Sequence, residues 1–231
     1  MVLHHAAAMP RERQGAARFA GALFLIAMAA SLFGGTLVGA ALPAPGNPGA
    51  VNPGGLLSGA LIELVNAFAV VGIAACFYPA LRRHGEHAAL GYLCIRVIEA
   101  VFCALAALAP LMLIALGRMP WALEDGNLRA LYALAVSMWD GLANILIPLS
   151  FCVGAALFYG LMYKSRLVPR FVSIWGAVGV AAILAMNLLS AFGAGFPQEI
   201  LMVLAIPMIA NEVFLGFWLL FRGFRHASTA S

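Results

Sequence analysis

Long apolar stretches separated by short polar segments follow one another from about residue 18 to the end of the chain. Each stretch holds about 20 residues or more, the length that an α-helix needs to cross roughly 30 Å of hydrocarbon. The pattern therefore predicts an all-α, polytopic membrane protein, a bundle of six transmembrane helices. The predicted spans are residues 18–42, 56–81, 88–116, 128–163, 170–192 and 199–221.

The fourth stretch, with 36 residues, is too long for one simple span. Either its first two turns lie along the membrane interface, or the helix is long and tilted, with a bend at Pro148. The first stretch raises a different question, because it follows basic residues as a signal peptide would. Its apolar run exceeds 20 residues, whereas the apolar region of a cleaved signal peptide has about 7–15, so we expect the first helix to be retained.

Composition agrees with a membrane protein. Hydrophobic residues make up 64% of the 231 residues and charged residues 10%, whereas soluble domains have about 25% charged residues. So little polar surface cannot enclose an apolar core of this size in water. The composition excludes a soluble globule, a disordered tail and a nucleic-acid-binding module.

Basic residues lie almost entirely on one side of the predicted bundle. Ten of the 13 lie before the first span, after the last span, or in and beside the second and fourth loops, which are all on one side of the membrane. Arg118 and Arg129 lie on the other side, and Arg96 falls within a span. The positive-inside rule then predicts that both termini are cytoplasmic, with tails of residues 1–17 and 225–231 around a membrane domain of residues 18–224. Arginine outnumbers lysine twelve to one, which indicates a GC-rich bacterial genome and hence a bacterial plasma membrane.

Nine polar or ionisable side chains fall inside the predicted spans, where hydrocarbon makes them costly. They are Glu63, Asn66, Arg96, Glu99, Asp140, Asn144, Asn187, Asn211 and Glu212. Three pairs among them are three or four residues apart, so each pair shares one helical face. We expect these faces to turn towards one another inside the bundle and to form a site for a ligand or a proton.

The four acids in this set outnumber its single base, which leaves a formal charge of −3 if all of them ionise. Arg96 should keep one carboxylate charged, most simply that of Glu99 on its own helical face. The remaining acids must take up protons, share a bound cation or lie in water. Protonatable carboxylates in the middle of a membrane are typical of proton relays and cation-coupled carriers.

The same residues also fit a purely structural interpretation. Asparagine and carboxylic acids form hydrogen bonds between helices, and one Arg–Glu pair can fix the register of a helix. Three hypotheses therefore stand: a small transporter or ligand-binding membrane protein, a non-catalytic interaction or regulatory subunit, and a membrane enzyme acting on lipid or quinone. The surplus of acids favours the first, because packing alone does not require it. An enzyme is the weakest of the three, because no nucleophile–base pair is visible.

Neither a metal nor a cofactor is expected from the sequence. His84 and His87 lie in a short basic loop with no third ligand nearby. None of the five histidines falls in a span, which argues against a haem held between helices. The net charge of +4 reflects membrane topology, so we expect no nucleic-acid partner. The expected partners are the lipid bilayer and a small ligand, proton or cation.

Glycines four residues apart indicate close helix packing. Gly35 and Gly39 form one such pair, and Gly55 and Gly59 form another. The small-xxx-small spacing lets two helix backbones approach each other in a membrane.

Several short segments follow one another in a distinctive order. They are residues 18–21 (Arg-Phe-Ala-Gly), 96–100 (Arg-Val-Ile-Glu-Ala), 157–161 leading to 167–170 (Leu-Val-Pro-Arg) and 175–176 (Trp-Gly), and 211–212 (Asn-Glu) followed by 216–224. In order and spacing they resemble the bacterial six-helix integral membrane family known as domain of unknown function 4386. The resemblance covers residues 18–224 and is weakest in residues 43–55 and in the outer half of the fourth span. It implies a six-helix topology, draws attention to Arg96, Glu99 and Glu212, and supplies no substrate.

Overall fold

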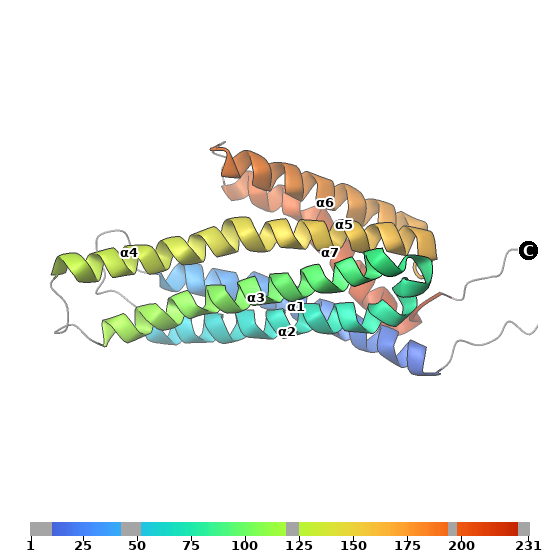
Figure 1. The fold of residues 1–231 in the computed structure, drawn as a ribbon, viewed down its shortest axis with the longest axis horizontal. Helices are drawn as coiled ribbons and strands as arrows, with labels where there is room; N and C mark the ends of the chain where they lie inside the picture. The colour runs from blue at the N-terminus through green and yellow to red at the C-terminus, as the bar shows by residue number, and fades with distance from the viewer. Residues whose placement is uncertain (1–10, 43–51, 119–124, 194–197, 226–231) are drawn as a thin grey trace, which may run out of the picture.

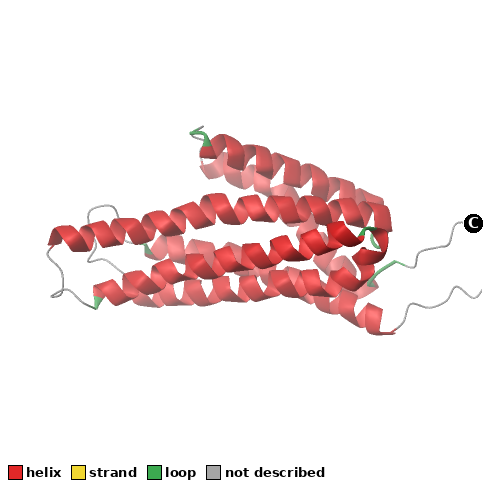
Figure 2. Cartoon of the chain, in the orientation of Figure 1, coloured by secondary structure: helices red, strands yellow, loops and turns green. Residues whose placement is uncertain are grey.

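In the computed structural model, the residues described are 11–42, 52–118, 125–193 and 198–225, and every regular element within these ranges is helical (Figures 1 and 2). Seven α-helices account for most of them, joined in places by a 3₁₀ turn at Arg82–His84 and a π-helical turn at Leu142–Leu146. The helices are α1 (Arg11–Ala41), α2 (Pro53–Leu81), α3 (Glu86–Gly117), α4 (Asp125–Gly141), α5 (Ile147–Ser165), α6 (Arg170–Ala191) and α7 (Gln198–Arg222).

Six helical runs are long and apolar enough to cross a membrane. They are Arg13–Ala41, Pro53–His84, Glu86–Gly117, Gly126–Ser165, Arg170–Ala191 and Val203–Arg222. The predicted all-α bundle of six spans is therefore confirmed. The first helix begins at Arg11, earlier than the residue 18 at which the apolar run starts.

The long fourth span is one continuous helix, built from α4, the π-helical turn and α5. Its 40 residues reach about 60 Å at 1.5 Å per residue, and α4 extends past the ends of α6 and α7 (Figure 1). Within the turn, the backbone N–H of Ile147 donates to the carbonyl of Leu142, five residues back. Pro148, which follows, has no N–H to donate, and a π-bulge is one way to absorb such a gap in the hydrogen-bond ladder.

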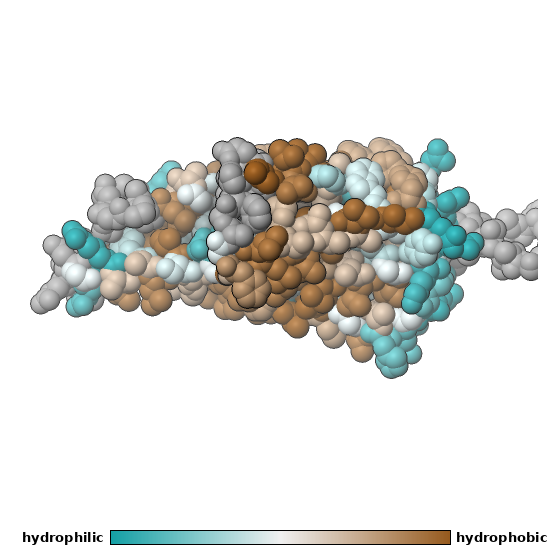
Figure 3. Space-filling model, turned by 90° about the horizontal axis from the view of Figure 1, so that it is seen from above, coloured by the Kyte–Doolittle hydropathy of each residue, from teal (hydrophilic) through white to brown (hydrophobic). Residues whose placement is uncertain are grey.

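The two ends of the bundle differ in chemistry. The start of α1, the end of α7 and the α2–α3 and α5–α6 connections all lie at one end (Figure 1). Hydrophilic side chains gather at both ends of the bundle, whereas hydrophobic ones cover the middle (Figure 3). We call the end with these segments the basic end, because it carries Arg18, Arg82, Arg83, Lys164, Arg166, Arg170, Arg222 and Arg225. The basic residues that share a predicted side thus share one end of the bundle.

Helix α1 packs closely against α2 and α7 at glycines. A Cβ at Gly21 would lie 2.7 Å from the carbonyl oxygen of Gly216 on α7, too close for any side chain. A Cβ at Gly59 on α2 would lie 3.1 Å from the carbonyl oxygen of Gly34. Gly59 therefore makes a close helix contact of the kind its spacing predicts, against Val38 and Gly34 on α1.

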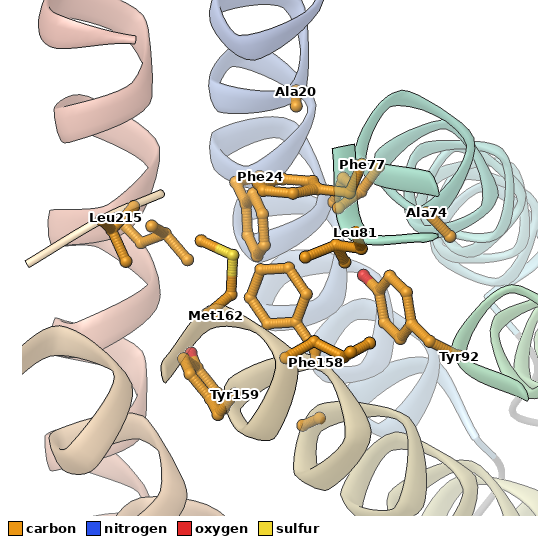
Figure 4. Close-up of a cluster of buried hydrophobic side chains, with 14 of the residues drawn as sticks. Ala20, Phe24, Ala74, Phe77, Leu81, Tyr92, Phe158, Tyr159, Met162 and Leu215 are labelled. Atoms are coloured by element: carbon orange, nitrogen blue, oxygen red, sulfur yellow. The ribbon is translucent and has the colours of Figure 1, made fainter. Parts of the chain in front are cut away.

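Two apolar cores hold the helices together. The larger one fills the half towards the basic end and centres on a cluster of aromatic side chains (Figure 4). The Phe77 and Phe158 rings pack edge to face with their centroids 5.0 Å apart, and the tilted rings of Phe24 and Phe158 have centroids 5.9 Å apart. The smaller core lies towards the opposite end and draws its buried residues from α1 to α4, including Leu113 and Tyr132. Helices α6 and α7 join the first core and lean away from the other helices beyond it (Figure 1).

Candidate functional site

A cavity of 370 Å³ lies where α6 and α7 lean away from the rest of the bundle. Five of the nine intramembrane polar residues line it, and they come from four helices. They are Asn66 on α2, Arg96 and Glu99 on α3, Asn187 on α6 and Glu212 on α7. The structure therefore brings these five side chains together around one internal space.

The cavity is covered on the side of α1, α2 and α3 towards the basic end. Its lining residues nearest that end on these helices, which are Phe24, Ile73 and Arg96, are at most 4% exposed, and Phe24 also belongs to the aromatic cluster of the larger core. The wall is less covered further along α1, because Ser31 is exposed and Leu32 is 44% exposed.

Arg96 and Glu99 form a buried ion pair on α3. Arg96 Nη1 donates to both carboxylate oxygens of Glu99, at 2.9 and 2.8 Å, and the two residues are 4% and 3% exposed. Their spacing of three residues predicts this contact. A buried pair of this kind neutralises its own charges, but removal of either partner leaves the other charge uncompensated.

The guanidinium of Arg96 is further fixed by aromatic rings. Its Cζ lies 5.3 Å from the centroid of the Phe151 ring and 5.6 Å from that of Tyr92, within cation–π range. Gly154 on α5 leaves room for it, because a Cβ there would lie 3.5 Å from Arg96 Nε. That nitrogen is buried and has no hydrogen-bond partner among the described residues.

Glu212 supplies a second carboxylate from the other side of the cavity. Its side chain is partly exposed, and within the described ranges it takes part in no hydrogen bond or ion pair. Arg96 and Glu99 are the charged groups that act on it electrostatically. Since Arg96 already pairs with Glu99, Glu212 is the surplus acid of the cavity.

The two asparagines add neutral polar groups to the wall. Asn187 Nδ2 donates to the carbonyl of Ile183, one turn back on its own helix, at 2.9 Å. Asn66 Nδ2 makes a long contact of 4.0 Å with Cys103 Sγ. Neither amide oxygen accepts a hydrogen bond from the residues described, so both remain available to an occupant of the cavity.

Asn211 lies outside the cavity, although it precedes Glu212 directly. Tyr159 Oη donates to Asn211 Oδ1 at 2.6 Å, and Asn211 Nδ2 donates to the carbonyl of Val172 at 2.9 Å. Asn211 is fully buried, and this network joins α5, α6 and α7. Asn211 thus ties three helices together and does not line this cavity, and its role in ligand binding stays a prediction.

Glu63 also lies outside the cavity, against α1. Its Oε1 is 3.0 Å from the position that a Cβ would take at Gly34. Residues three apart on a helix point in directions that differ by about 60°. This difference is enough for Asn66 to face the cavity while Glu63, on the same helix α2, faces α1.

Asp140 and Asn144 form the third pair, and neither lines the cavity. Asn144 Nδ2 donates to Asp140 Oδ1 at 2.6 Å, and both residues are exposed beside the π-helical turn, whose Ala143 does line the cavity. Of the three predicted pairs, only Arg96 and Glu99 face the cavity together. The expectation that all three converge is therefore wrong.

Sequence reasoning did not single out the apolar part of the wall. Phe24, Met28, Phe151 and Met208 line the cavity beside the polar groups. In a chain of apolar spans such residues carry no signal of their own, since their neighbours in sequence are equally apolar. Ser31, the remaining polar residue of the wall, was missed because a lone serine in a transmembrane helix is common.

The cavity combines charged and neutral polar groups with an apolar wall. It offers one neutralised ion pair, one carboxylate without a counter-ion and two amides between apolar and aromatic walls. Across the described parts of the chain, no group of three or more histidine, cysteine, aspartate or glutamate side chains could hold a metal ion. The arrangement suits recognition of a small molecule or uptake of a proton.

Comparison with known proteins gives one match. The family model described as a domain of unknown function, DUF4386, matches residues 19–223, a range that includes every residue of the cavity wall. No curated protein and no solved structure matches the chain. Because the family model covers most of the sequence, the protein belongs to the DUF4386 family.

Proposed function

We propose that the protein binds a small ligand in the cavity between α3 and α7, as a small transporter or a ligand-binding membrane protein. The observation that carries the proposal is Glu212, a carboxylate that faces an internal cavity without a partner among the described residues. An ionisable group at this depth is costly, and functional sites are where such a cost is usually met. A proton or a ligand would neutralise the charge of Glu212, which the surrounding side chains do not.

A comparison of Asn211 with the polar residues of the cavity supports binding, and not packing, as the role of the cavity residues. Asn211 has the character of a packing residue, since both of its polar groups are hydrogen-bonded and it does not line the cavity. Glu212 and the amide oxygens of Asn66 and Asn187 differ in both respects. An enzyme acting on lipid or quinone is a weaker alternative, because Ser31, the one hydroxyl of the described wall, makes no hydrogen bond with Glu212 or another base that could activate it.

The basic end gives the proposed orientation of the bundle in the membrane. In this proposal that end faces the cytoplasm of a bacterial cell, because the positive-inside rule retains arginine-rich segments there. Both chain termini then lie in the cytoplasm, and the exposed wall residues Ser31 and Leu32 lie in the half of α1 that is further from the cytoplasm. We propose that the ligand enters from that half.

The test uses purified full-length protein in detergent. A panel of small anions, cations and neutral molecules is screened for ligands that raise the melting temperature of the wild type. We expect Glu212→Gln to fold with an unchanged melting temperature and to lose the ligand-induced rise. If no ligand acts on the wild type and Glu212→Gln lowers stability as much as Asn211→Ala does, the polar residues serve packing and an interaction subunit becomes the better interpretation.

A further inference from the structure

We propose that the occupant of the cavity is a monovalent organic cation, whose ammonium group pairs with Glu212 while its apolar body lies against Phe24 and the methionines of the wall. The inference rests on the proposed function and adds a substrate class to it. It follows from three properties of the cavity: its charge, the reach of Arg96 and the nature of its walls.

The charge of the cavity favours a cation. Arg96 and Glu99 cancel each other at a distance of 2.8 Å, and Glu212 adds one formal negative charge. The other polar groups of the wall, Ser31, Asn66 and Asn187, are neutral. A positively charged ligand is therefore the partner that completes the balance, since a buried charge is tolerated when it is paired.

Arg96 is poorly placed to bind an anion instead. Its Nη1 is engaged by both oxygens of Glu99, and its Nε is buried out of reach of a ligand, which leaves Nη2 as the nitrogen that could donate to one. The guanidinium also lies against the Phe151 ring. An anionic ligand bound to Nη2 alone would share Arg96 with Glu99 and would meet Glu212 as a like charge.

The walls favour an organic cation over a metal ion. Sodium and similar ions need several oxygen ligands around one point, whereas the polar groups here are spread over α1, α2, α6 and α7. Most of the wall is apolar, with Phe24, Met28 and Met208 among the residues that line it. A volume of 370 Å³ is at the lower end of the range for ligand pockets, about 300–1,000 Å³.

A proton can compete with the ligand cation for Glu212, and the groups around Glu212 influence both. Arg96, Glu99 and Tyr92 on α3 and Tyr159 on α5 interact with it electrostatically. The helices packed directly against α7 are α1 and α6, and they contribute the neutral Ser31 and Asn187 to the cavity wall. A proton and the ligand cation therefore compete for the single carboxylate of Glu212.

Three probes of matched size separate the possibilities. Benzyltrimethylammonium carries a permanent positive charge, neopentylbenzene has the same shape without charge, and 3-phenylpropionate is an anion of similar size. Binding of each to the full-length protein in detergent is measured by calorimetry. We expect the cation to bind the wild type and the anion not to bind.

Two variants provide the comparison. Glu212→Gln should weaken binding of the cation at least about tenfold, because it removes the counter-charge. Glu63→Gln is the matched control, since it removes an intramembrane carboxylate that lies outside the cavity, and it should leave the affinity unchanged. If Glu212→Gln does not fold, the wild type alone decides: lowering the pH should weaken binding of the cation and leave binding of neopentylbenzene unaffected.

The outcomes also separate this inference from the proposed function. Binding of the neutral or the anionic probe as tight as that of the cation, or cation binding that neither Glu212→Gln nor falling pH weakens, would overturn the organic-cation assignment and leave a ligand-binding cavity. No binding of any probe would overturn it as well. The proposed function itself fails only if, in addition, the broader ligand screen finds nothing that depends on the cavity residues.

Discussion

The hydroxyl of Tyr159 on α5 donates a 2.6 Å hydrogen bond to the side-chain oxygen of Asn211 on α7. The amide of Asn211 in turn donates to the backbone carbonyl of Val172 on α6. This network fastens α6 and α7 to the bundle beside the larger core, and the two helices lean away only beyond it (Figure 1). The network thus lies directly beside the cavity, since Asn211 precedes Glu212 of the cavity wall.

Loss of this fastening should destabilise the protein. In Tyr159→Phe, the oxygen of Asn211 is left buried without its donor, which costs about 1–3 kcal/mol of unfolding free energy. Thermal or denaturant unfolding in detergent measures the change. Tyr163→Phe on the same helix is the control, because Tyr163 is 43% exposed and its hydroxyl makes no hydrogen bond with the described residues. Equal stability of the two variants would show that the network does not hold the helices.

Close packing of α1 against α7 makes a second prediction. A Cβ at Gly21 would lie 2.7 Å from both the carbonyl oxygen of Gly216 and the backbone nitrogen of Leu220, atoms that cannot move without the whole helix. Gly21→Ala should therefore lower the unfolding free energy by about 1–3 kcal/mol.

Gly160 on α5 provides the matched control for this substitution. No atom lies within 4 Å of the position that its Cβ would take. Gly160→Ala should leave stability unchanged or raise it by up to about 1 kcal/mol, because alanine favours the helix. A Gly21→Ala variant as stable as Gly160→Ala would contradict the close crossing of α1 and α7.

Features that depend on local spacing could be predicted from the sequence. The six spans follow from the length of the apolar runs, and the Arg96–Glu99 pair follows from a spacing of three residues with opposite charges. The long fourth helix was one of two alternatives, and the π-helical turn before Pro148 is a detail that the position of a proline suggests but does not specify.

Features that depend on neighbouring helices could not be predicted. Glu63 and Asn66 have the same spacing as Arg96 and Glu99, yet only Asn66 faces the cavity. Helix α2 borders both the cavity and α1, and Glu63 lies on the side that packs against α1. Asn211 and Glu212 are adjacent in sequence and have opposite surroundings. Both outcomes depend on the directions in which the helices pack, which the apolar pattern of a membrane helix leaves open.

The proposed orientation predicts the side from which each end of the bundle can be labelled. Arg83 lies at the basic end and Asn127 at the opposite end, and both are exposed. In a variant without native cysteines, a cysteine at position 127 should react with a membrane-impermeant maleimide added to intact cells. A cysteine at position 83 should react only after the cells are opened. The reverse pattern would place the basic end outside and contradict the proposed topology.

The buried ion pair makes the last prediction. In Glu99→Leu, Arg96 keeps its charge but loses its ion-pair partner, and the uncharged aromatic ring beside its guanidinium cannot replace the carboxylate. Loss of one partner of a buried pair lowers the unfolding free energy by about 3–5 kcal/mol. The double variant Arg96→Met, Glu99→Leu removes both charges and should be more stable than Glu99→Leu alone. Unfolding free energies of the wild type, both single variants and the double variant form the complete cycle. If Glu99→Leu is as stable as the double variant, Glu212 has taken over as the partner of Arg96. The cavity of that variant then has no surplus acid, and the variant should lose its affinity for the cation while the wild type keeps it.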